Sequence, residues 1–300
     1  MKSAKGYFLI AAAATLWGAS ATIVKHLFNI QFQPLIIIQT RVSIAFLVLL
    51  LAVLVKNPSS LRFRIKDIPL IALVGIGGIA GSNYFYYYAI RESNVATAIL
   101  VQYSAPMMVA IYAVIVQGEK MTRWKLLSLV VSTLGIFLAV GGLDGLLVAR
   151  GAGILYALVA AVSYSIFNIA GKPLTRRYAI WPSMIFSLGA ATIFWLFVQP
   201  PQVILSAGYS LSDWGIFALV STTSILVPYS FYFAGLHLLT PTRAIITSTL
   251  EPVVAIATAY FFLGGGMAPL QVAGGTMVIG AIVLLELTSS TANGTVGEQQ

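Results

Sequence analysis

The sequence predicts an all-α membrane protein with ten transmembrane helices in two inverted five-helix repeats, and three observations support this. Of the 300 residues, 59% are hydrophobic and 8% are charged, whereas soluble domains carry about 25% charged residues. The apolar runs are long and unbroken, which is typical of membrane helices and not of the short alternating strands of a barrel. The second half of the chain also repeats features of the first half at a nearly constant spacing.

Ten apolar runs are each long enough to cross the hydrocarbon core of a bilayer, which takes about 20 residues. Turn-forming segments such as Asn57-Pro58 and Pro200-Pro201 separate them. The remaining loops are too short for a separate soluble domain. The expected spans are 7–25, 34–55, 68–89, 94–117, 124–142, 151–171, 180–199, 213–236, 242–263 and 268–287.

The positions of Lys and Arg predict how these spans are oriented, because the cytoplasmic segments of membrane proteins are enriched in both residues. If the N-terminus is cytoplasmic, thirteen of the 17 basic residues fall on the inner side. Lys25, Arg41, Arg91 and Arg150 fall on the outer side or in the outer half. Both termini are therefore expected in the cytoplasm.

The internal repeat covers five helices. Its residue pairs are 147 positions apart at the start and 146 positions apart later, so one inserted or deleted residue reconciles the two spacings. An odd number of spans turns the second copy upside down relative to the first, as in many secondary transporters. We expect a first repeat over 1–146, a second repeat over 147–288 and a disordered polar tail over 289–300. The pairs are Gly6 and Gly153, Trp17 and Tyr164, Lys25 and Lys172, Pro106 and Pro252, Gly118 and Gly264, and Met121 and Met267.

Several functional classes find no support in the sequence. There is no cysteine, which excludes disulfides, thiolate metal sites and cysteine nucleophiles. The basic residues form no continuous run, so we expect no nucleic-acid partner. No Gly-Lys-Ser/Thr motif is present to bind ATP phosphates. The eight acidic residues and two histidines form no cluster suited to metal binding or acid–base catalysis, so we expect no enzyme, no metal and no cofactor.

Glu251 is the sharpest candidate for a functional residue. It lies near the middle of the expected span 242–263, where an ionisable side chain costs roughly 3 kcal/mol and should face a cavity or a partner. It would bind a substrate amine, or it would take up a proton and so couple transport to the proton gradient. In the alternative, structural role, Glu251 is neutral and ties helix ends together beside Pro252, which frees a backbone carbonyl. The sequence is consistent with both roles.

A set of aromatic and amide side chains lies near the middle of three expected spans. Trp17 and its counterpart Tyr164 are far from the interface where Trp and Tyr usually lie, so their polar hydrogens need partners inside the bundle. Asn168 is one helical turn beyond Tyr164, and Gln102 and Tyr103 lie in the fourth span. These side chains would line a midplane cavity suited to aromatic or broadly apolar substrates. The alternative is ordinary interhelical packing with polar contacts.

The third expected span contains the aromatic run 83–88. Since a helix turns once in 3.6 residues, Asn83 and Tyr87 share a face. We expect this face to line the cavity because a buried Asn needs polar partners, whereas Tyr88 suits the interfacial aromatic belt. The counterpart run in the eighth span adds Tyr232 to the candidate cavity residues.

Arg41 lies about two turns into the second expected span, in its outer half. It would attract a substrate carboxylate, or it would extend to the outer interface or donate to a backbone carbonyl. The structural roles are the more common ones for such a residue.

The segment 106–135, which contains Gly118-Glu119, and its partner segment 250–264 carry a family resemblance, together with Trp17-Gly18 and Arg41. Over about residues 6–287 the chain resembles the drug/metabolite transporter superfamily, in its ten-helix branch of paired EamA-type repeats. Within that superfamily it is similar to the bacterial aromatic amino acid exporters. The second repeat departs from the pattern because Gly264-Gly265 replaces the Gly-Glu pair.

The resemblance implies ten helices with both termini inside, a central cavity formed mainly by helices 1, 3, 4, 6, 8 and 9, and alternating access. We therefore expect a bacterial inner-membrane exporter of small metabolites, chiefly aromatic and other neutral amino acids, that works as a monomer in the lipid bilayer. A multidrug or other metabolite efflux carrier is the alternative within the transporter class, and a channel is the alternative outside it. Facilitated and proton-coupled transport are both open. The candidate cavity residues are Trp17, Asn83, Tyr87, Gln102, Tyr103, Tyr164, Asn168, Tyr232 and Glu251.

Overall fold

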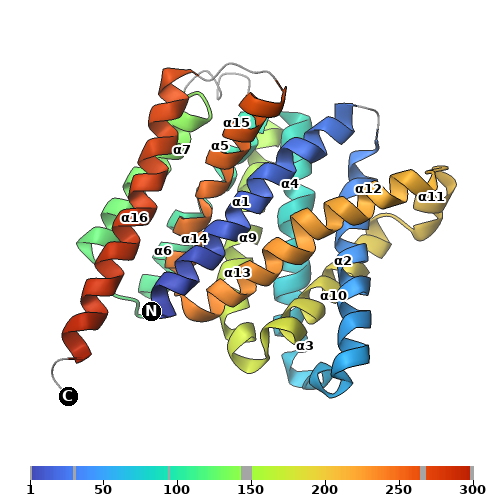
Figure 1. Cartoon of the computed structure of the whole chain (residues 1–300), viewed down its shortest axis with the longest axis horizontal. Helices are drawn as coiled ribbons and strands as arrows, with labels where there is room; N and C mark the ends of the chain where they lie inside the picture. The colour runs from blue at the N-terminus through green and yellow to red at the C-terminus, as the bar shows by residue number, and fades with distance from the viewer. Residues whose placement is uncertain (1, 30–31, 94, 143–150, 264–267, 298–300) are drawn as a thin grey trace.

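The chain is helical throughout the part that the computed structural model describes, which is residues 2–29, 32–93, 95–142, 151–263 and 268–297. No strand occurs among these residues. Figure 1 shows the helices packed into one bundle, with α7 and α16 as a pair along one side. The all-helical fold class expected from the unbroken apolar runs is therefore confirmed.

The first half of the chain is built from seven α-helices and three shorter helical segments in its described part. The α-helices are α1 (Lys2–Asn29), α2 (Pro34–Lys56), α3 (Ile68–Ala72), α4 (Gly81–Glu92), α5 (Val95–Gln102), α6 (Ala105–Ile115) and α7 (Arg123–Ala139). The shorter segments are η1 (Pro58–Leu61), η2 (Ile65–Asp67) and η3 (Leu73–Ala80).

The second half is built in a similar order. Its α-helices are α9 (Gly151–Arg177), α10 (Ile180–Val198), α11 (Pro201–Ser206), α12 (Leu211–Ser221), α13 (Val227–Leu238), α14 (Pro241–Ser248), α15 (Leu250–Leu263) and α16 (Pro269–Gly297), and η4 (Thr222–Leu226) joins α12 to α13. The last helix, α16, continues to Gly297.

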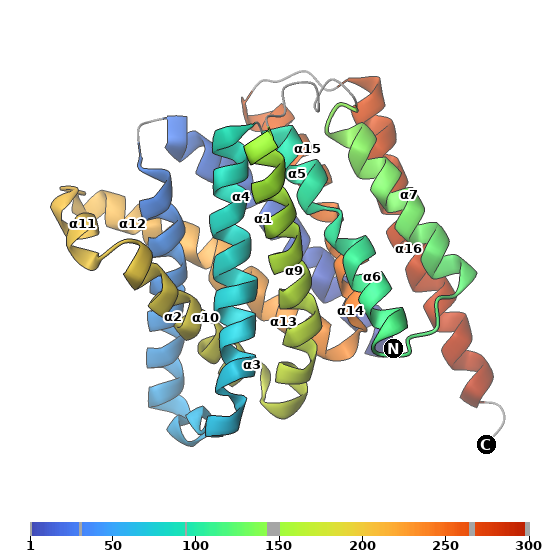
Figure 2. The ribbon, with the colours of Figure 1, turned by 180° about the vertical axis from the view of Figure 1, so that it is seen from behind.

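Eight helical stretches of the described chain are long and apolar enough to cross a membrane. The other two expected spans correspond to α1, which has 28 residues, and α7, which has 17. Figures 1 and 2 show α1 running through the bundle, and it packs along α13 and α15, while α7 packs along α16. The eight stretches are Pro34–Lys56, Ile65–Glu92, Thr97–Ile115, Ala152–Arg177, Ile180–Val198, Leu211–Leu238, Pro241–Phe262 and Pro269–Thr288.

The fourth and ninth expected spans are each broken near the middle. The span expected over 94–117 consists of α5 and α6, with a turn at Tyr103 and Ser104 between them. The span expected over 242–263 consists of α14 and α15, with Thr249 between them. Both expected spans are nevertheless present, because Thr97–Ile115 and Pro241–Phe262 are each long and apolar enough to cross a membrane.

Proline accounts for both breaks. Pro106 and Pro252 have no backbone N–H, so the carbonyls of Gln102 and Ser248, four residues earlier, lose their usual helical donors. Each proline therefore removes one helical backbone hydrogen bond near the middle of a membrane span. Broken helices at membrane depth are tolerated where they are enclosed by protein, and in secondary transporters they often form the substrate site.

The third and eighth spans each contain a stretch of π-helix, η3 and η4. Stretches of π-helix are rare in proteins, and many of those that occur lie at functional sites. Gly78 lets η3 approach α9 closely, because a Cβ on Gly78 would lie 2.9 Å from the backbone of Phe167. The breaks and the π-helical stretches thus occur at matching places in the two halves.

Apolar side chains cover the outside of the bundle. Val55, Phe197 and Leu211 are each at least 85% exposed, which fits lipid contact and not water. Inside, Trp195 and Phe167 are fully buried, and many hydroxyl and amide groups are enclosed with them. The interior is therefore the place where a polar substrate would find partners.

Candidate functional site

Glu251 lies in the first turn of α15, directly after the break of the ninth span. The hydroxyl of Tyr103, at the break of the fourth span, donates a hydrogen bond to Glu251 Oε2 at 2.8 Å. The two breaks, one from each half of the chain, therefore lie together. The N-terminal end of a helix also suits a negative charge, because the unpaired N–H groups carry partial positive charge.

Aromatic rings from α1, α9 and α13 form a cluster in the bundle. The Trp17 ring lies 5.1 Å from each of the rings of Tyr229 and Tyr232, measured between centroids. The Phe167 ring lies 5.6 Å from Tyr229 and 5.3 Å from Tyr232. Trp17 Nε1 donates to the carbonyl of Ser224 at 3.0 Å, which is the partner that a midplane Trp requires. We call these four rings, together with Tyr164, the aromatic cluster.

Polar groups of the aromatic cluster are tied to their neighbours. Tyr232 donates a hydrogen bond to Asn168 Oδ1, and Asn168 Nδ2 donates to the carbonyl of Tyr164 at 2.8 Å. The Tyr164 hydroxyl donates to Ser248 Oγ at 2.9 Å. The Tyr164 ring also lies 6.4 Å from the ring of Tyr103, which connects the aromatic cluster to Glu251. The structure thus connects five of the predicted residues to Glu251 through successive hydrogen bonds and ring contacts: Tyr103, Tyr164, Asn168, Tyr232 and Trp17.

Arg41 points into the bundle and not along the outer interface. Its Nη2 donates a hydrogen bond to Asn83 Oδ1, while Asn83 Nδ2 donates to the carbonyl of Ile79 at 2.8 Å. Arg41 Nε is buried and has no hydrogen-bond partner within the described part of the chain. The guanidinium attracts Glu251 electrostatically, but the two groups lie farther apart than the 4.0 Å of an ion pair.

Two predicted site residues make their recorded side-chain contacts with other partners. Gln102 Nε2 donates to Ser82 Oγ at 3.0 Å, and the Tyr87 ring lies 5.4 Å from that of Tyr88. In the described chain, neither has a hydrogen bond or ring contact with Glu251 or Trp17. Their predicted place in a cavity with Glu251 stays a prediction.

Sequence reasoning missed three members of the arrangement. Phe167 and Tyr229 belong to the aromatic cluster, and Ser248 receives the hydrogen bond of Tyr164. Helical periodicity held the signal for the first two, because Phe167 follows Tyr164 by three residues and Tyr229 precedes Tyr232 by three. Ser248 had no such signal, since its role depends on the break at Thr249.

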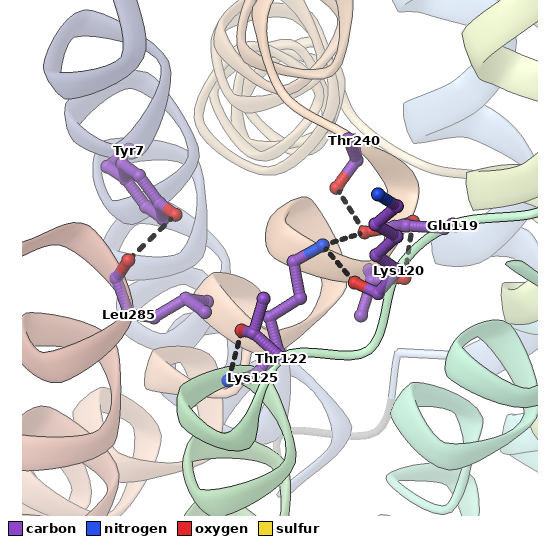
Figure 3. Close-up of polar contacts among 8 residues, drawn as sticks. Tyr7, Glu119, Lys120, Thr122, Lys125, Thr240 and Leu285 are labelled. Atoms are coloured by element: carbon purple, nitrogen blue, oxygen red, sulfur yellow. Dashed lines mark hydrogen bonds and ion pairs between the residues drawn. The ribbon is translucent and has the colours of Figure 1, made fainter. Parts of the chain in front are cut away.

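A second polar cluster lies where the α6–α7 loop meets the connection between α13 and α14 (Figure 3). Lys125 Nζ donates to Glu119 Oε1 at 2.7 Å, and the hydroxyls of Thr240 and Thr242 donate to Glu119 Oε1 and Oε2 at 3.1 Å each. Lys125 Nζ also donates to the carbonyl of Lys120 at 3.0 Å. The side chains of Lys125 and Glu119 are 10% and 13% exposed, so this loop cluster is largely removed from solvent.

Two hollows in the described structure lie elsewhere. One, of about 420 Å³, is apolar and lies between α1 and α13, with Phe8 and Phe231 among its lining residues. The other, of about 190 Å³, lies among α7, α15 and α16, with Val253 and Gln271 in its lining. Neither is lined by Glu251 or Arg41, so we base the candidate site on polar contacts and not on these hollows.

A helical bundle with an apolar exterior, two broken spans that meet inside and a carboxylate at their meeting point is typical of multi-pass membrane transporters. The model of the EamA-like transporter family matches the chain twice, over residues 4–141 and 151–287. The chain belongs to the EamA-like transporter family.

Relatives of the chain include proteins named as exporters of amino acids. The threonine/homoserine exporter RhtA of Escherichia coli (strain K12) is 28% identical over 293 residues, which cover 94% of this chain and 90% of the relative. A probable terminal-alkyne amino-acid exporter of Streptantibioticus cattleyicolor is 27% identical over 234 residues, or 75% of each chain. An uncharacterized transporter of Archaeoglobus fulgidus is 26% identical over 211 residues, covering 69% of this chain and 74% of the relative.

A solved crystal structure has the same fold. It superposes with a TM-score of 0.73 over 96% of this chain and 98% of its own, at 18% sequence identity. At this identity the likeness concerns the fold alone.

Proposed function

We propose that this protein is a secondary transporter that exports small metabolites, chiefly aromatic and other neutral amino acids, by alternating access. The observation that carries the proposal is the hydrogen bond between Tyr103 and Glu251, which joins two broken helices from opposite halves of the chain. Broken helices from two related halves are a recurrent substrate site of secondary transporters. Two of the relatives are named as amino acid exporters, which supports the substrate class.

The proposal includes the membrane arrangement expected from the sequence. The chain crosses the bacterial inner membrane ten times, with α1 and α7 as the two additional spans and both termini in the cytoplasm. Residues 1–146 and 147–288 form inverted repeats, followed by a tail over 289–300, and the protein works as a monomer. The matching breaks and π-helical stretches of the two halves support the repeat. The excess of Lys and Arg in inner segments supports the orientation.

The proposed substrate site is the region around Glu251, with Asn83, Tyr87, Gln102, Tyr103, Asn168 and the aromatic cluster around it. Glu251 would bind the amine of the substrate, and the rings would contact an apolar or aromatic side chain. The same rings favour a second candidate function, the efflux of aromatic drugs, because stacking does not require an amino acid.

Uptake into proteoliposomes tests the function directly. Labelled phenylalanine, tryptophan, threonine and a cationic dye would each be offered with and without an imposed proton gradient, and protein-free liposomes would serve as the control. We expect saturable amino acid flux that is stimulated by amino acid on the opposite side, as in a carrier. Flux of the dye alone would support drug efflux, and flux that never saturates would support a channel. A requirement for the gradient would assign proton coupling, with Glu251 as the first residue to examine.

A further inference from the structure

We infer that Arg41 and Glu251 are the two charged ends of one binding site for an α-amino acid zwitterion. Arg41, held by Asn83, takes the α-carboxylate, and Glu251, held by Tyr103, takes the α-ammonium of the same molecule. The inference rests on the proposed function and names its recognition element. Beyond the proposed function, Arg41 becomes a ligand-binding residue, and the ligand must carry both a carboxylate and an ammonium group.

Arg41 has donors to spare. A guanidinium carries five N–H donors in a flat fork that matches a carboxylate. In the described chain, the side chain of Arg41 makes one hydrogen bond, from Nη2 to Asn83, and its buried Nε has no partner. A buried donor without an acceptor is unfavourable by about 1–3 kcal/mol. A ligand carboxylate would satisfy the donors that the protein leaves free.

Asn83 also fixes the position of Arg41. Its amide nitrogen is bound to the carbonyl of Ile79 on its own helix, so its oxygen is turned toward the guanidinium. The backbone of Arg41 is anchored as well, because Ser221 Oγ donates to its carbonyl at 2.6 Å. An arginine held at both ends is oriented before a ligand arrives, which lowers the entropy lost on binding.

Glu251 has acceptors to spare. An ionised carboxylate offers about four acceptor positions. Glu251 uses one of them in the described structure, for the Tyr103 hydroxyl on Oε2, and Oε1 accepts no hydrogen bond there. The ammonium group of an amino acid carries three donors and would bind the free oxygen.

Arg41 and Glu251 carry opposite charges but form no ion pair with each other, which favours a ligand that binds both. Arg41 and Glu251 attract each other but do not reach the 4.0 Å of an ion pair. Two opposite charges in a low-dielectric interior that do not touch are each poorly compensated. A zwitterion between them compensates both and leaves the site neutral overall. A cationic amine or an anionic acid would compensate one charge and leave a net charge enclosed.

The aromatic cluster lies next to the Glu251 end of this site. Gly18 on α1 packs against α15, where a Cβ would lie 2.8 Å from Val254 Cβ. The aromatic cluster also reaches Glu251 through Tyr103, whose hydroxyl binds Glu251 and whose ring lies 6.4 Å from that of Tyr164. A substrate held by its two charged groups would therefore direct its side chain toward Trp17 and its neighbouring rings.

Competition with charge-deleted analogues tests the inference on purified full-length protein. Labelled phenylalanine bound to wild type would be displaced by phenylalanine, its methyl ester, N-acetyl-phenylalanine and phenethylamine in a scintillation proximity assay. The ester and the amine lack the carboxylate, and the N-acetyl compound lacks the ammonium. We expect each to compete about ten- to a hundredfold more weakly than phenylalanine, since each loses charge-assisted hydrogen bonds.

Two variants assign each charge to its residue. In Arg41→Gln the advantage of phenylalanine over its ester should shrink to about twofold or less, while its advantage over the N-acetyl compound remains. In Glu251→Gln the advantage of phenylalanine over the N-acetyl compound should shrink in the same way, while its advantage over the ester remains. Arg91→Gln and Glu92→Gln serve as matched controls, because these two residues form an exposed ion pair at 2.9 Å, and they should keep the wild-type pattern.

The outcomes separate this inference from the proposed function. If wild type binds amino acids but the ester and the N-acetyl compound compete as well as phenylalanine, the zwitterion site is refuted and amino acid export stands. If wild type binds and transports no amino acid, the proposed function fails first. If a variant does not fold, the competition by the four compounds on wild type decides by itself. If the advantages of phenylalanine over its ester and over the N-acetyl compound change equally in both variants, the assignment of the carboxylate to Arg41 and of the ammonium to Glu251 is overturned.

Discussion

Glu119 and Glu251 are enclosed carboxylates from opposite halves of the chain, and their surroundings differ. Glu119 accepts hydrogen bonds from Lys125 at 2.7 Å and from Thr240 and Thr242 at 3.1 Å each. Glu251 accepts one within the described chain, from Tyr103 at 2.8 Å. The positive charge beside Glu119 is in direct contact with it, whereas the nearest counterpart for Glu251, Arg41, lies beyond ion-pair distance.

This difference separates a structural carboxylate from one that is available to a ligand. The protein itself supplies the partners of Glu119, which ties the α6–α7 loop to the connection between α13 and α14. Glu251 keeps an unused oxygen at the meeting point of two broken helices. We therefore expect changes at Glu119 to alter the free energy of unfolding, and changes at Glu251 to alter transport.

The largest effect is expected for Glu119→Ala. The change removes the acceptor of a largely buried Lys125 and leaves its charge unpaired, which should lower the free energy of unfolding by about 3–5 kcal/mol. Thermal or denaturant unfolding of the purified protein in detergent measures this. The double variant Glu119→Gln with Lys125→Met removes both charges together and should recover most of the loss. A loss below about 1 kcal/mol, the range of an exposed pair, would mean that the loop cluster does not hold these loops together.

Glu251→Gln should have the opposite profile. The amide is nearly the same size as the carboxylate, so expression and the unfolding temperature should stay close to those of wild type. Transport of amino acids should fall by about a hundredfold or more, which corresponds to roughly 2.7 kcal/mol, because the amide lacks the charge that binds the ammonium. Proteoliposome flux measures the change, with Glu92→Gln as the exposed control. Unchanged flux in Glu251→Gln would assign Glu251 a structural role and end the contrast with Glu119.

Gly18→Ala tests whether the helix carrying Glu251 is held close to α1. A Cβ at Gly18 would lie 2.8 Å from Val254 Cβ and 2.9 Å from the Ala255 nitrogen, so we expect a loss of about 1–3 kcal/mol in stability together with weaker transport. Gly280→Ala is the matched control, since nothing lies within 4 Å of a Cβ there. Alanine in an open helical position should be neutral or stabilising by about 0.5–1 kcal/mol. Equal behaviour of the two variants would contradict the close contact.

Sequence patterns predicted most of the membrane spans well, but they did not predict that two of these spans are broken. Apolar runs gave most spans within a few residues, because a helix must satisfy its own backbone in lipid. Pro106 and Pro252 were visible in the sequence. A proline in a membrane helix, however, kinks the helix, breaks it or leaves it unchanged, depending on the residues around it. Whether these prolines break the helix at Tyr103 and Thr249 depends on packing between the two halves, and the periodicity of one helix holds no information about that packing.

The same limit applies to the site. Glu251 was predictable because a charge in the middle of a span is rare. Arg41 was not assigned to the bundle interior, because an arginine two turns from a helix end reaches the interface as readily as a partner. Its contact with Asn83 depends on the rotation of α2 relative to α4, which the sequence does not specify. Two partners of Glu119 were hidden in the same way, since Thr240 and Thr242 belong to the other half of the chain.

The smallest effect is expected for Trp17→Ala. This variant sharpens the comparison of Glu251 with Glu119 because it tests whether the aromatic cluster beside Glu251 contacts the substrate. Trp17 contacts the rings of Tyr229 and Tyr232 at 5.1 Å and should contribute to contacts with an aromatic substrate. An aromatic pair contributes about 0.5–1.5 kcal/mol beyond its buried area, so affinity for phenylalanine and tryptophan should fall about two- to tenfold, while that for threonine changes little. Trp181, which is half exposed, provides the control Trp181→Ala. The measurement is the concentration of each amino acid that half-saturates flux. An equal loss for threonine and phenylalanine would show that Trp17 supports the fold around Glu251 and does not contact the substrate side chain, and specificity would then reside in the charged pair alone.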